Sequence, residues 1–407
     1  MPNRLQIEGQ ASLHRRLSLP LLVLYGVGIT VGAGIYVLIG AVVGHAGIYA
    51  PWSFALAAFV MAFTVGSYAE LCTRFPVSAG EAAYVREAFH SRPLSVLTGL
   101  ITIGIGAVSS SAVALGSAGY IQQFIDLPQN LIAVIVVLVL GVVAAWGILE
   151  SVLLASLFTV IEVGGLVAII AAGIYADVPA TISLQPPLEI EALSGIAYAS
   201  LLAFFAFIGF EDLANAVEEA KVPHRDIPRA MVLTLIISTF LYIAVAATAV
   251  GAVSVERLST APAPLSLVFR ELAGISPMTI SAIAIVATLN TILAQMTMAA
   301  RVIYGMARGG DLPRAAGHVN PRTGTPLLAT CLVAVVVIAL ALSVPFEWLA
   351  ESTSLATLSV FGLINLALLT IHVQRANVHR HHLRVPIWVP AAGFISCVAM
   401  IASALLR

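Results

Sequence analysis

Long uncharged stretches alternate with short charged connections along the chain. A transmembrane helix needs about 20 consecutive apolar residues, and eight runs without Asp, Glu, Lys or Arg reach that length. These runs are residues 17–69, 93–125, 127–149, 230–255, 272–300, 323–346, 352–374 and 385–406. The first run is long enough for two helices, and two further apolar stretches, residues 151–176 and 193–217, carry acidic residues inside them. The pattern predicts an all-α integral membrane protein with about 11 transmembrane helices.

The first predicted helix contains a run of small residues from Gly28 to Tyr36, GITVGAGIY. Glycine weakens a helix interior, and unpaired backbone groups at membrane depth are tolerated only where protein buries them or they line a cavity. A half-helix beginning near Gly34 would direct amide N–H groups and the positive end of its dipole at an anion such as a carboxylate. Close helix packing is the alternative, because small residues four apart, such as Gly28 and Gly32, also permit it.

The sixth predicted helix is interrupted in its middle as well. Gly209 is followed there by two adjacent carboxylates, Glu211 and Asp212. A charged side chain at the bilayer centre costs about 2.5–3.5 kcal/mol, so such groups face a cavity or a partner. The sixth helix also enters the membrane from the side opposite to the first. Two glycine-interrupted helices at matching places in two oppositely oriented halves indicate a transporter with its site at the midplane.

The basic residues predict the orientation in the membrane, because Arg and Lys accumulate in cytoplasmic loops. With residues 1–16 as a cytoplasmic N-terminal segment, 16 of the 19 basic residues fall inside. The inside residues are Arg4, Arg15, Arg16, Arg74, Arg86, Arg92, Lys221, Arg225, Arg229, Arg301, Arg308, Arg314, Arg322, Arg375, Arg380 and Arg384. Only Arg257, Arg270 and Arg407 fall outside. We therefore expect a multi-pass protein of the cytoplasmic membrane with a cytoplasmic N-terminus.

Composition agrees with the membrane assignment. Of the 407 residues, 60% are hydrophobic and 10% are charged, against about 25% charged in soluble domains, and the mean hydropathy is +1.02. The formal net charge of −1 gives no sign of a nucleic-acid partner. The three cysteines lie in or at the ends of predicted helices without CxxC spacing, so we expect no disulfide-linked partner subunit through an external loop. No cofactor or metal site is expected.

Four sequence blocks carry a resemblance to a known family. They are Gly28–Val37 (GITVGAGIYV), Tyr68–Tyr84 (YAELCTRFPVSAGEAAY), Phe204–Ala230 (FFAFIGFEDLANAVEEAKVPHRDIPRA) and Ala299–Pro326 (AARVIYGMARGGDLPRAAGHVNPRTGTP). On these blocks the chain resembles a bacterial member of the amino acid-polyamine-organocation superfamily, close to its cationic amino acid transporter branch. The resemblance covers about residues 15–375.

The resemblance implies an inverted five-plus-five helix repeat, the leucine-transporter-like fold, in which helices 1 and 6 are unwound. Residues 17–176 and 193–374 would form the two repeats, and residues 385–407 would form helix 11. It also implies a permease that moves an amino acid across a bacterial or archaeal cell membrane by alternating access, in a symport coupled to protons. Relatives commonly have 12 or more helices, whereas this chain ends after 11; the ten-helix core is intact.

The resemblance also assigns the substrate-binding positions. The substrate carboxylate is expected at the amides of Gly32, Ala33 and Gly34. The ammonium is expected at free carbonyls near Thr30 and at Phe205, Ala206 and Ile208. Phe207 or Phe210 is a candidate gate or a ring beside the ammonium, with simple packing as the alternative. These expectations agree with the residues themselves, since a helix N-terminus suits an anion and exposed carbonyls suit a cation.

One departure from the family concerns the coupling ion. Proton-coupled relatives carry a lysine in the middle of helix 5, but the only lysine here, Lys221, lies in a predicted loop. Alignment places Glu162 at that position. We hypothesise that Glu162 titrates during transport, and that it donates a hydrogen bond to a helix 1 carbonyl when protonated. Ionised, it could instead hold a cation with hydroxyls such as Thr288 or Thr291; a permanently neutral structural glutamic acid is the third possibility.

Other functions compete with proton-coupled transport. A sodium-coupled amino acid or amine carrier and an amino acid exchanger differ from it only in the driving gradient. A membrane enzyme needs a convergent nucleophile and base or a metal set, and the predicted spans contain no HExxH motif and no pair of His or Asp. A channel needs no pair of broken helices. We therefore expect a transporter and not an enzyme.

Overall fold

The computed structural model describes residues 17–75, 80–146, 152–179, 189–215, 220–274, 278–374 and 383–405, with a few single positions between them. Across these ranges the secondary structure is helical, and the only pairing of extended residues is an isolated parallel bridge between Leu17 and Ala220. The predicted all-α class is confirmed.

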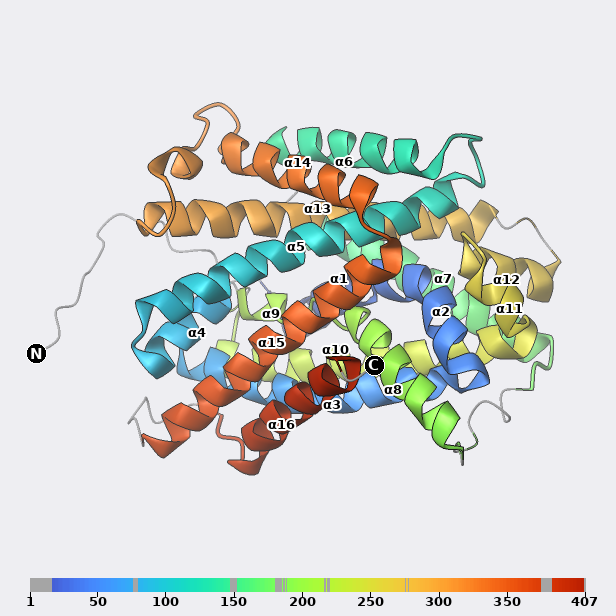
Figure 1. Ribbon diagram of the computed structural model, residues 1–407, viewed down its shortest axis with the longest axis horizontal. Helices are drawn as coiled ribbons and strands as arrows, with labels where there is room; N and C mark the ends of the chain where they lie inside the picture. The colour runs from blue at the N-terminus through green and yellow to red at the C-terminus, as the bar shows by residue number, and fades with distance from the viewer. Residues whose placement is uncertain are drawn as a thin grey trace, which may run out of the picture.

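Figure 1 shows the helices in chain order along the colour ramp. They are α1 (Leu19–Val31), α2 (Ala33–Ala46), α3 (Ala50–Arg74), α4 (Gly80–Phe89), α5 (Arg92–Ile121), α6 (Gln129–Trp146), α7 (Val152–Tyr175), α8 (Ile190–Phe205), α9 (Asp212–Asn215), α10 (Pro223–Ala252), α11 (Val255–Ser259), α12 (Pro264–Ala273), α13 (Met278–Arg308), α14 (Leu327–Ser343), α15 (Phe346–Val373) and α16 (Trp388–Leu405). Two short 3₁₀ turns, η1 (Gly47–Tyr49) and η2 (Arg314–Gly317), lie in connections.

Length and composition identify the helices that can cross a membrane. Among the described residues, eight helical stretches satisfy both criteria, and the first of them, Leu19–Arg74, runs through α1, α2 and α3 over 56 residues. Two more apolar helices, α8 and α14, are shorter. The chain is therefore a multi-pass membrane protein.

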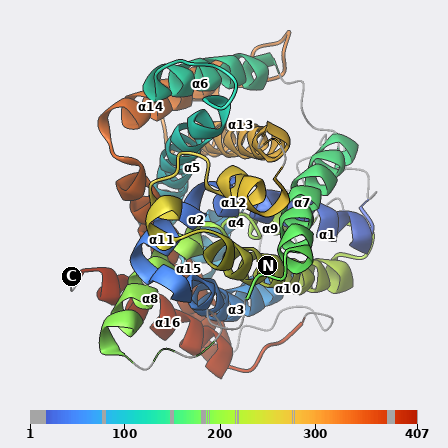
Figure 2. The same cartoon turned by 90° about the vertical axis from the view of Figure 1, so that its right-hand side faces the viewer.

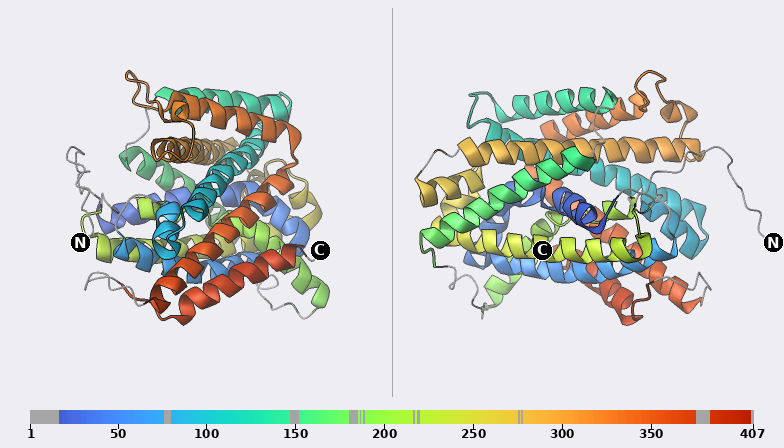
Figure 3. Two further views of the ribbon diagram at one scale, coloured as in Figure 1. Left: turned by 60° about the vertical axis from the view of Figure 1, so that its left-hand side comes forward. Right: turned by 180° about the vertical axis from the view of Figure 1, so that it is seen from behind.

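The helices form layers around a buried centre. Helices α5 and α13 pack side by side, and α6 packs with α14 on one flank of the bundle, while α3, α15 and α16 pack together on the opposite flank (Figures 1 and 2). Seen from behind, α7 crosses obliquely between α13 and α10 and packs against both (Figure 3). Most residues of α2 are buried. Because α2 is buried on nearly all sides, its neighbours fix its position, and they therefore also fix the position of the helix break between α1 and α2.

Polar side chains join the layers at a few points. The Ser111 hydroxyl of α5 donates to the Val337 carbonyl of α14 at 3.1 Å. Asn365 of α15 accepts a hydrogen bond from Ser67 at 2.6 Å and donates one to Thr64 at 2.9 Å, both on α3. Such interhelical hydrogen bonds add to packing where no hydrophobic driving force exists between helices. Ser111 thus bridges α5 and α14.

The connections contain more helix than the charge pattern indicates. Residues 80–89 form a short helix between two uncharged runs, and the segment that joins the uncharged runs 230–255 and 272–300 carries α11 and α12. Pro264 occupies the first turn of α12, and Gly274 closes it with φ 63°. Proline at a helix start and glycine just past its end are local signals for a helix, and they outweigh the polar composition of this segment.

Candidate functional site

The first predicted interruption separates α1 from α2. Helix α1 ends at Val31, Gly32 has φ −30° and ψ −117°, and α2 begins at Ala33. The Gly32 N–H still donates to the Gly28 carbonyl at 3.2 Å, whereas the Ala33 N–H donates to the Thr291 hydroxyl of α13 at 3.0 Å. The first N–H groups of a helix have no partner within the helix. The start of α2 therefore combines a side-chain anchor with the positive end of a helix dipole.

The second interruption lies between α8 and α9. Helix α8 ends at Phe205, residues 206–211 form turns, and α9 begins at Asp212. Gly209 has φ 125°, a backbone conformation that side chains with a Cβ rarely adopt. Its N–H donates to the Glu211 carboxylate at 2.8 Å. Both interruptions predicted from the sequence are confirmed, and one of the two acidic side chains supports the second break from within.

The two breaks touch each other. A Cβ atom on Gly34 would lie 2.4 Å from the Ala206 Cα atom, and a Cβ on Gly209 would lie 2.5 Å from the Ile29 side chain. Real Cβ atoms essentially never approach other heavy atoms that closely, so only glycine permits the contact at either position. The glycines that weaken the two helices therefore also let the broken segments meet.

A tyrosine of α10 joins the two breaks. The Tyr242 hydroxyl lies 2.6 Å from the Thr30 carbonyl, at the end of α1, and 2.7 Å from the Ala206 carbonyl, just after α8. A phenol has one hydrogen to donate, so the two carbonyl oxygens share it. Both carbonyls are thus within reach of a single donor group, and an ammonium, with three hydrogens, could satisfy both at once.

The predicted substrate-binding positions are all buried, but they do not form a single cluster. The positions concerned are Thr30, Gly32, Ala33, Gly34, Phe205, Ala206, Ile208 and Phe210. Direct contacts bring Gly34 to Ala206 and, through Tyr242, Thr30 to Ala206. The Phe205 carbonyl, expected to be free, accepts the Ile208 N–H at 3.2 Å.

Phe210 packs in a separate aromatic cluster. Its ring lies 5.5 Å from those of Tyr68 and Phe361, edge to face, and the Phe204 ring lies 5.9 Å from Phe361. We call Tyr68, Phe204, Phe210 and Phe361 the aromatic cluster. Phe207, in contrast, lies 4.9 Å from the Tyr242 ring. Of the two candidate gate residues, Phe207 therefore contacts the tyrosine that joins the breaks, and Phe210 packs in the aromatic cluster.

Glu162 lies fully buried on α7. Its backbone carbonyl accepts the Tyr36 hydroxyl of α2 at 2.6 Å, and its side-chain Oε1 lies 3.4 Å from the Asn290 amide nitrogen of α13. The other carboxyl oxygen, Oε2, has no hydrogen-bond partner among the described residues. A buried carboxyl group with an unfilled oxygen is costly unless it carries a proton or meets a cation. Glu162 is therefore a candidate site for either ion.

Comparison with known proteins gives this arrangement a family. Residues 17–406 match the model of a family described as amino acid permease. The chain belongs to the amino acid permease family. Its relatives include the branched-chain amino acid permease BcaP of Bacillus subtilis, 29% identical over 97% of this chain and 89% of that protein.

Two other relatives carry different names. Cationic amino acid transporter 4, vacuolar, of Arabidopsis thaliana is 30% identical over 89% of the present chain and 64% of the plant protein. A methylthioribose transporter of Bacillus subtilis is 28% identical over 95% of the permease and 87% of that relative. Family membership implies the leucine-transporter-like fold and amino acid transport, and it implies no enzymatic activity.

A buried polar cluster joins α3 to α15 at the end of the bundle that carries α4. Glu70 of α3 accepts Arg74 at 2.6 Å, His372 of α15 at 2.8 Å and the Val385 N–H at 2.8 Å. Nearby, Glu81 of α4 accepts the Tyr68 hydroxyl at 3.0 Å, and burial raises the pKa of the Glu81 carboxyl above its ordinary value.

Sequence reasoning missed Tyr242 altogether. A buried tyrosine hydroxyl normally finds a hydrogen-bond partner, and Tyr242 is the only tyrosine in the uncharged run over residues 230–255. That signal marks the residue as one with a polar task inside the membrane. It does not name the two carbonyls that the hydroxyl meets.

Proposed function

We propose that the permease is a secondary active transporter that moves an amino acid across the cytoplasmic membrane of a bacterium or archaeon by alternating access, coupled to protons through Glu162. The observation that carries the proposal is the pair of helix breaks in contact at the centre of the bundle, joined by Tyr242. The amides at the start of α2 and the positive end of its dipole suit a carboxylate, and the shared carbonyls of Thr30 and Ala206 suit an ammonium.

The proposed topology has 11 transmembrane helices and a cytoplasmic N-terminus. Each broken pair, α1 with α2 and α8 with α9, counts as one crossing. Residues 17–176 and 193–374 are the two inverted repeats, and residues 385–407 form the last helix. Support comes from the basic residues, 16 of which fall on the assigned inner side.

We propose that a bound substrate replaces hydrogen bonds that the substrate-free protein forms between its own groups. The Ala33 N–H donates to Thr291, so a bound carboxylate would displace that hydroxyl and also use the Gly34 amide. The ammonium would take over from Tyr242 at the Thr30 and Ala206 carbonyls. The binding set is therefore Thr30, Gly32, Ala33, Gly34, Phe205, Ala206 and Ile208, with Phe210 as part of the gate.

Coupling through Glu162 has a structural argument behind it. Asn290 faces the Glu162 carboxyl group, and the next residue of α13, Thr291, holds the Ala33 N–H. A change of charge at Glu162 would therefore act on the helix that also positions the start of α2. Sodium coupling is the second candidate, because carboxylate, amide and hydroxyl oxygens suit a hard cation.

Uptake into proteoliposomes tests the function. Leucine, valine, arginine and lysine are the first probes, because relatives are named for branched-chain and cationic amino acids. We expect saturable accumulation when the outside is acidic. Accumulation driven by a sodium gradient alone, or only against an internal amino acid, would establish the sodium carrier or the exchanger instead. A substrate panel with no saturable uptake under any gradient contradicts the transport proposal.

Glu162→Gln tests the coupling residue. The amide keeps the size of the carboxyl group but does not titrate, so we expect exchange to persist while acid-driven uptake loses its pH dependence. Glu256→Gln is the matched control, since Glu256 is exposed in α11. An unchanged pH profile in Glu162→Gln would show that another group carries the proton.

A further inference from the structure

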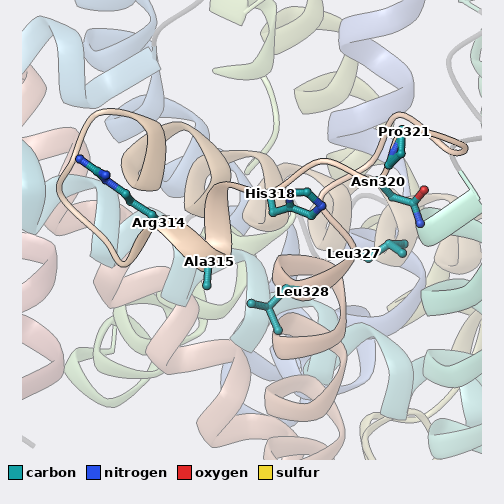
Figure 4. Close-up of a pocket in the computed structure, with 7 residues that line it drawn as sticks. All are labelled: Arg314, Ala315, His318, Asn320, Pro321, Leu327 and Leu328. Atoms are coloured by element: carbon teal, nitrogen blue, oxygen red, sulfur yellow. The ribbon is translucent and has the colours of Figure 1, made fainter.

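The connection between α13 and α14 contains a hollow at the surface of the bundle. Its volume is about 710 Å³, and Arg314, His318, Asn320, Leu327 and Leu328 line it. In Figure 4, Arg314 and Asn320 stand at opposite rims, His318 lies between them, and Leu328 lies on the side of α14. The rim is polar and the wall formed by α14 is apolar.

The hollow has a fixed shape because the connection is tied down. The Thr325 hydroxyl donates to the Ala145 carbonyl of α6 at 2.6 Å. The Asn320 N–H donates to the Thr325 carbonyl at 3.0 Å, and the Asn320 side chain accepts the Arg322 N–H at 2.8 Å. These bonds hold the rim against the first turn of α14.

The apolar wall continues along the outer face of α14. Leu328, Leu332, Val335 and Val336 are 45%, 49%, 64% and 45% exposed. Their spacing places them on one face of the helix, and the helix is apolar enough to lie in a membrane. An acyl chain on this face would begin at the hollow, so the hollow lies where a headgroup of the same lipid would be.

The charge around the hollow is positive and not neutralised within the described residues. Residues 308–326 contain three arginines and a single acid, Asp311. Asp311 is taken by Arg92 of α5, 2.7 Å away. Among the described residues, no carboxylate lies within 4 Å of Arg314 or Arg322, and both arginines are exposed.

We propose that this hollow binds the phosphodiester headgroup of an anionic phospholipid, with one acyl chain on the exposed face of α14. Arg314 lines the hollow and Arg322 lies two residues beyond Asn320, so these two arginines supply positive charge, and together with the His318 ring they supply donors for the phosphate oxygens. Asn320 orients the rim, and Leu327 and Leu328 receive the glycerol end of the chain. The proposed orientation places the site in the cytoplasmic leaflet, where anionic lipids attract basic segments. The site is separate from the helix breaks and adds a lipid ligand to the transporter.

Lipid binding to the purified full-length protein tests the site. Native mass spectrometry in a neutral detergent would count bound phosphatidylglycerol and, separately, phosphatidylcholine with the same acyl chains. We expect the double variant Arg314→Gln/Arg322→Gln to bind phosphatidylglycerol about tenfold more weakly, with phosphatidylcholine unchanged. Arg257→Gln/Arg270→Gln also removes two positive charges, but from α11 and α12 at the opposite end of the bundle (Figure 1), so we expect it to bind like wild type.

Further measurements separate the alternatives. Equal loss in both double variants would overturn the site in favour of a nonspecific charge effect. Displacement by glycerol 3-phosphate at the same concentration as by lipid would overturn the lipid as ligand and indicate a soluble phosphate. If the double variant does not fold, Leu332→Ser tests the acyl face: weaker phosphatidylglycerol binding supports the proposal, and unchanged binding contradicts it.

Discussion

Tyr242→Phe removes one hydroxyl group from the place where the two helix breaks meet. The hydroxyl oxygen lies 2.6 Å from the Thr30 carbonyl and 2.7 Å from the Ala206 carbonyl. All three residues are at most 3% exposed, so water cannot replace the donor. Leaving a buried acceptor unsatisfied costs about 1–3 kcal/mol. We expect the substrate-free variant to lose that amount from its free energy of unfolding.

The ring itself should stay in place. It packs 4.9 Å from Phe207 and 5.6 Å from Phe54, and phenylalanine keeps both contacts. A bound amino acid would bring an ammonium to the same carbonyls and restore the lost hydrogen bonds. We therefore expect transported amino acids to bind Tyr242→Phe more tightly than wild type, by up to about tenfold, because the ammonium no longer has to displace a hydroxyl group from the two carbonyls.

Two measurements check this prediction. SDS titration in mixed micelles, followed by tryptophan fluorescence, gives the change in the free energy of unfolding, and isothermal calorimetry gives the substrate affinity. Tyr175→Phe is the control, because Tyr175 is 94% exposed and should change neither quantity. Unchanged stability in Tyr242→Phe would mean that the hydroxyl does not hold the breaks together. Weaker substrate binding would mean that the Tyr242 hydroxyl contacts the bound substrate rather than occupying the position of its ammonium group.

Three further predictions concern other parts of the molecule. Gly34→Ala should abolish uptake, since its Cβ would lie 2.4 Å from the Ala206 Cα atom, just after α8, whereas Gly305→Ala, with open space around it, should transport normally in the same assay. Glu70→Ala should lower the free energy of unfolding by about 3–5 kcal/mol, because it leaves a buried arginine without its partner; a loss below 1 kcal/mol in SDS titration contradicts this. A hydrogen bond and the charge from Arg257 lower the pKa of the Glu271 carboxyl. This contribution to stability is present above the ordinary glutamate pKa and is lost as pH falls through the lowered value. In a plot of melting temperature against pH, Glu271→Gln should therefore reduce the fall at low pH. Screening by 1 M salt should have the same effect.

The two helix breaks could be predicted from the sequence because the residues that cause them lie next to each other along the chain. Three glycines between Gly28 and Gly34, and Gly209 followed by Glu211, weaken a helix wherever it packs. Phe210 is different, because a phenylalanine beside a break is compatible with a gate, a substrate contact or packing. Only its distances to Tyr68 and Phe361 assign it to the aromatic cluster.

The contacts that join the breaks could not be predicted, because they cross long stretches of chain. Tyr242 reaches a carbonyl 212 residues away and another 36 residues away. Thr291 reaches Ala33 across 258 residues. Periodicity and composition report on neighbours in sequence, whereas these hydrogen bonds depend on how α10 and α13 lie against α1 and α2. Hydroxyl groups inside uncharged runs are the only local sign of such contacts. Many of them donate to a carbonyl of their own helix instead, as the Ser110 hydroxyl does to the Gly106 carbonyl.

Helix α13 illustrates what the three-dimensional arrangement adds to the candidate ion site. Asn290 and Thr291 are consecutive, and successive residues of a helix point about 100° apart, so one can face α7 while the other faces the start of α2. Asn290 meets the Glu162 carboxyl group and Thr291 holds the Ala33 N–H. A rotation or shift of α13 changes both contacts at once, because Asn290 and Thr291 are neighbours on the same helix. If the proposed function holds, Thr291 connects the proposed ion site to the proposed substrate site, and a proton or cation at Glu162 would change the affinity for a carboxylate at α2 through this connection.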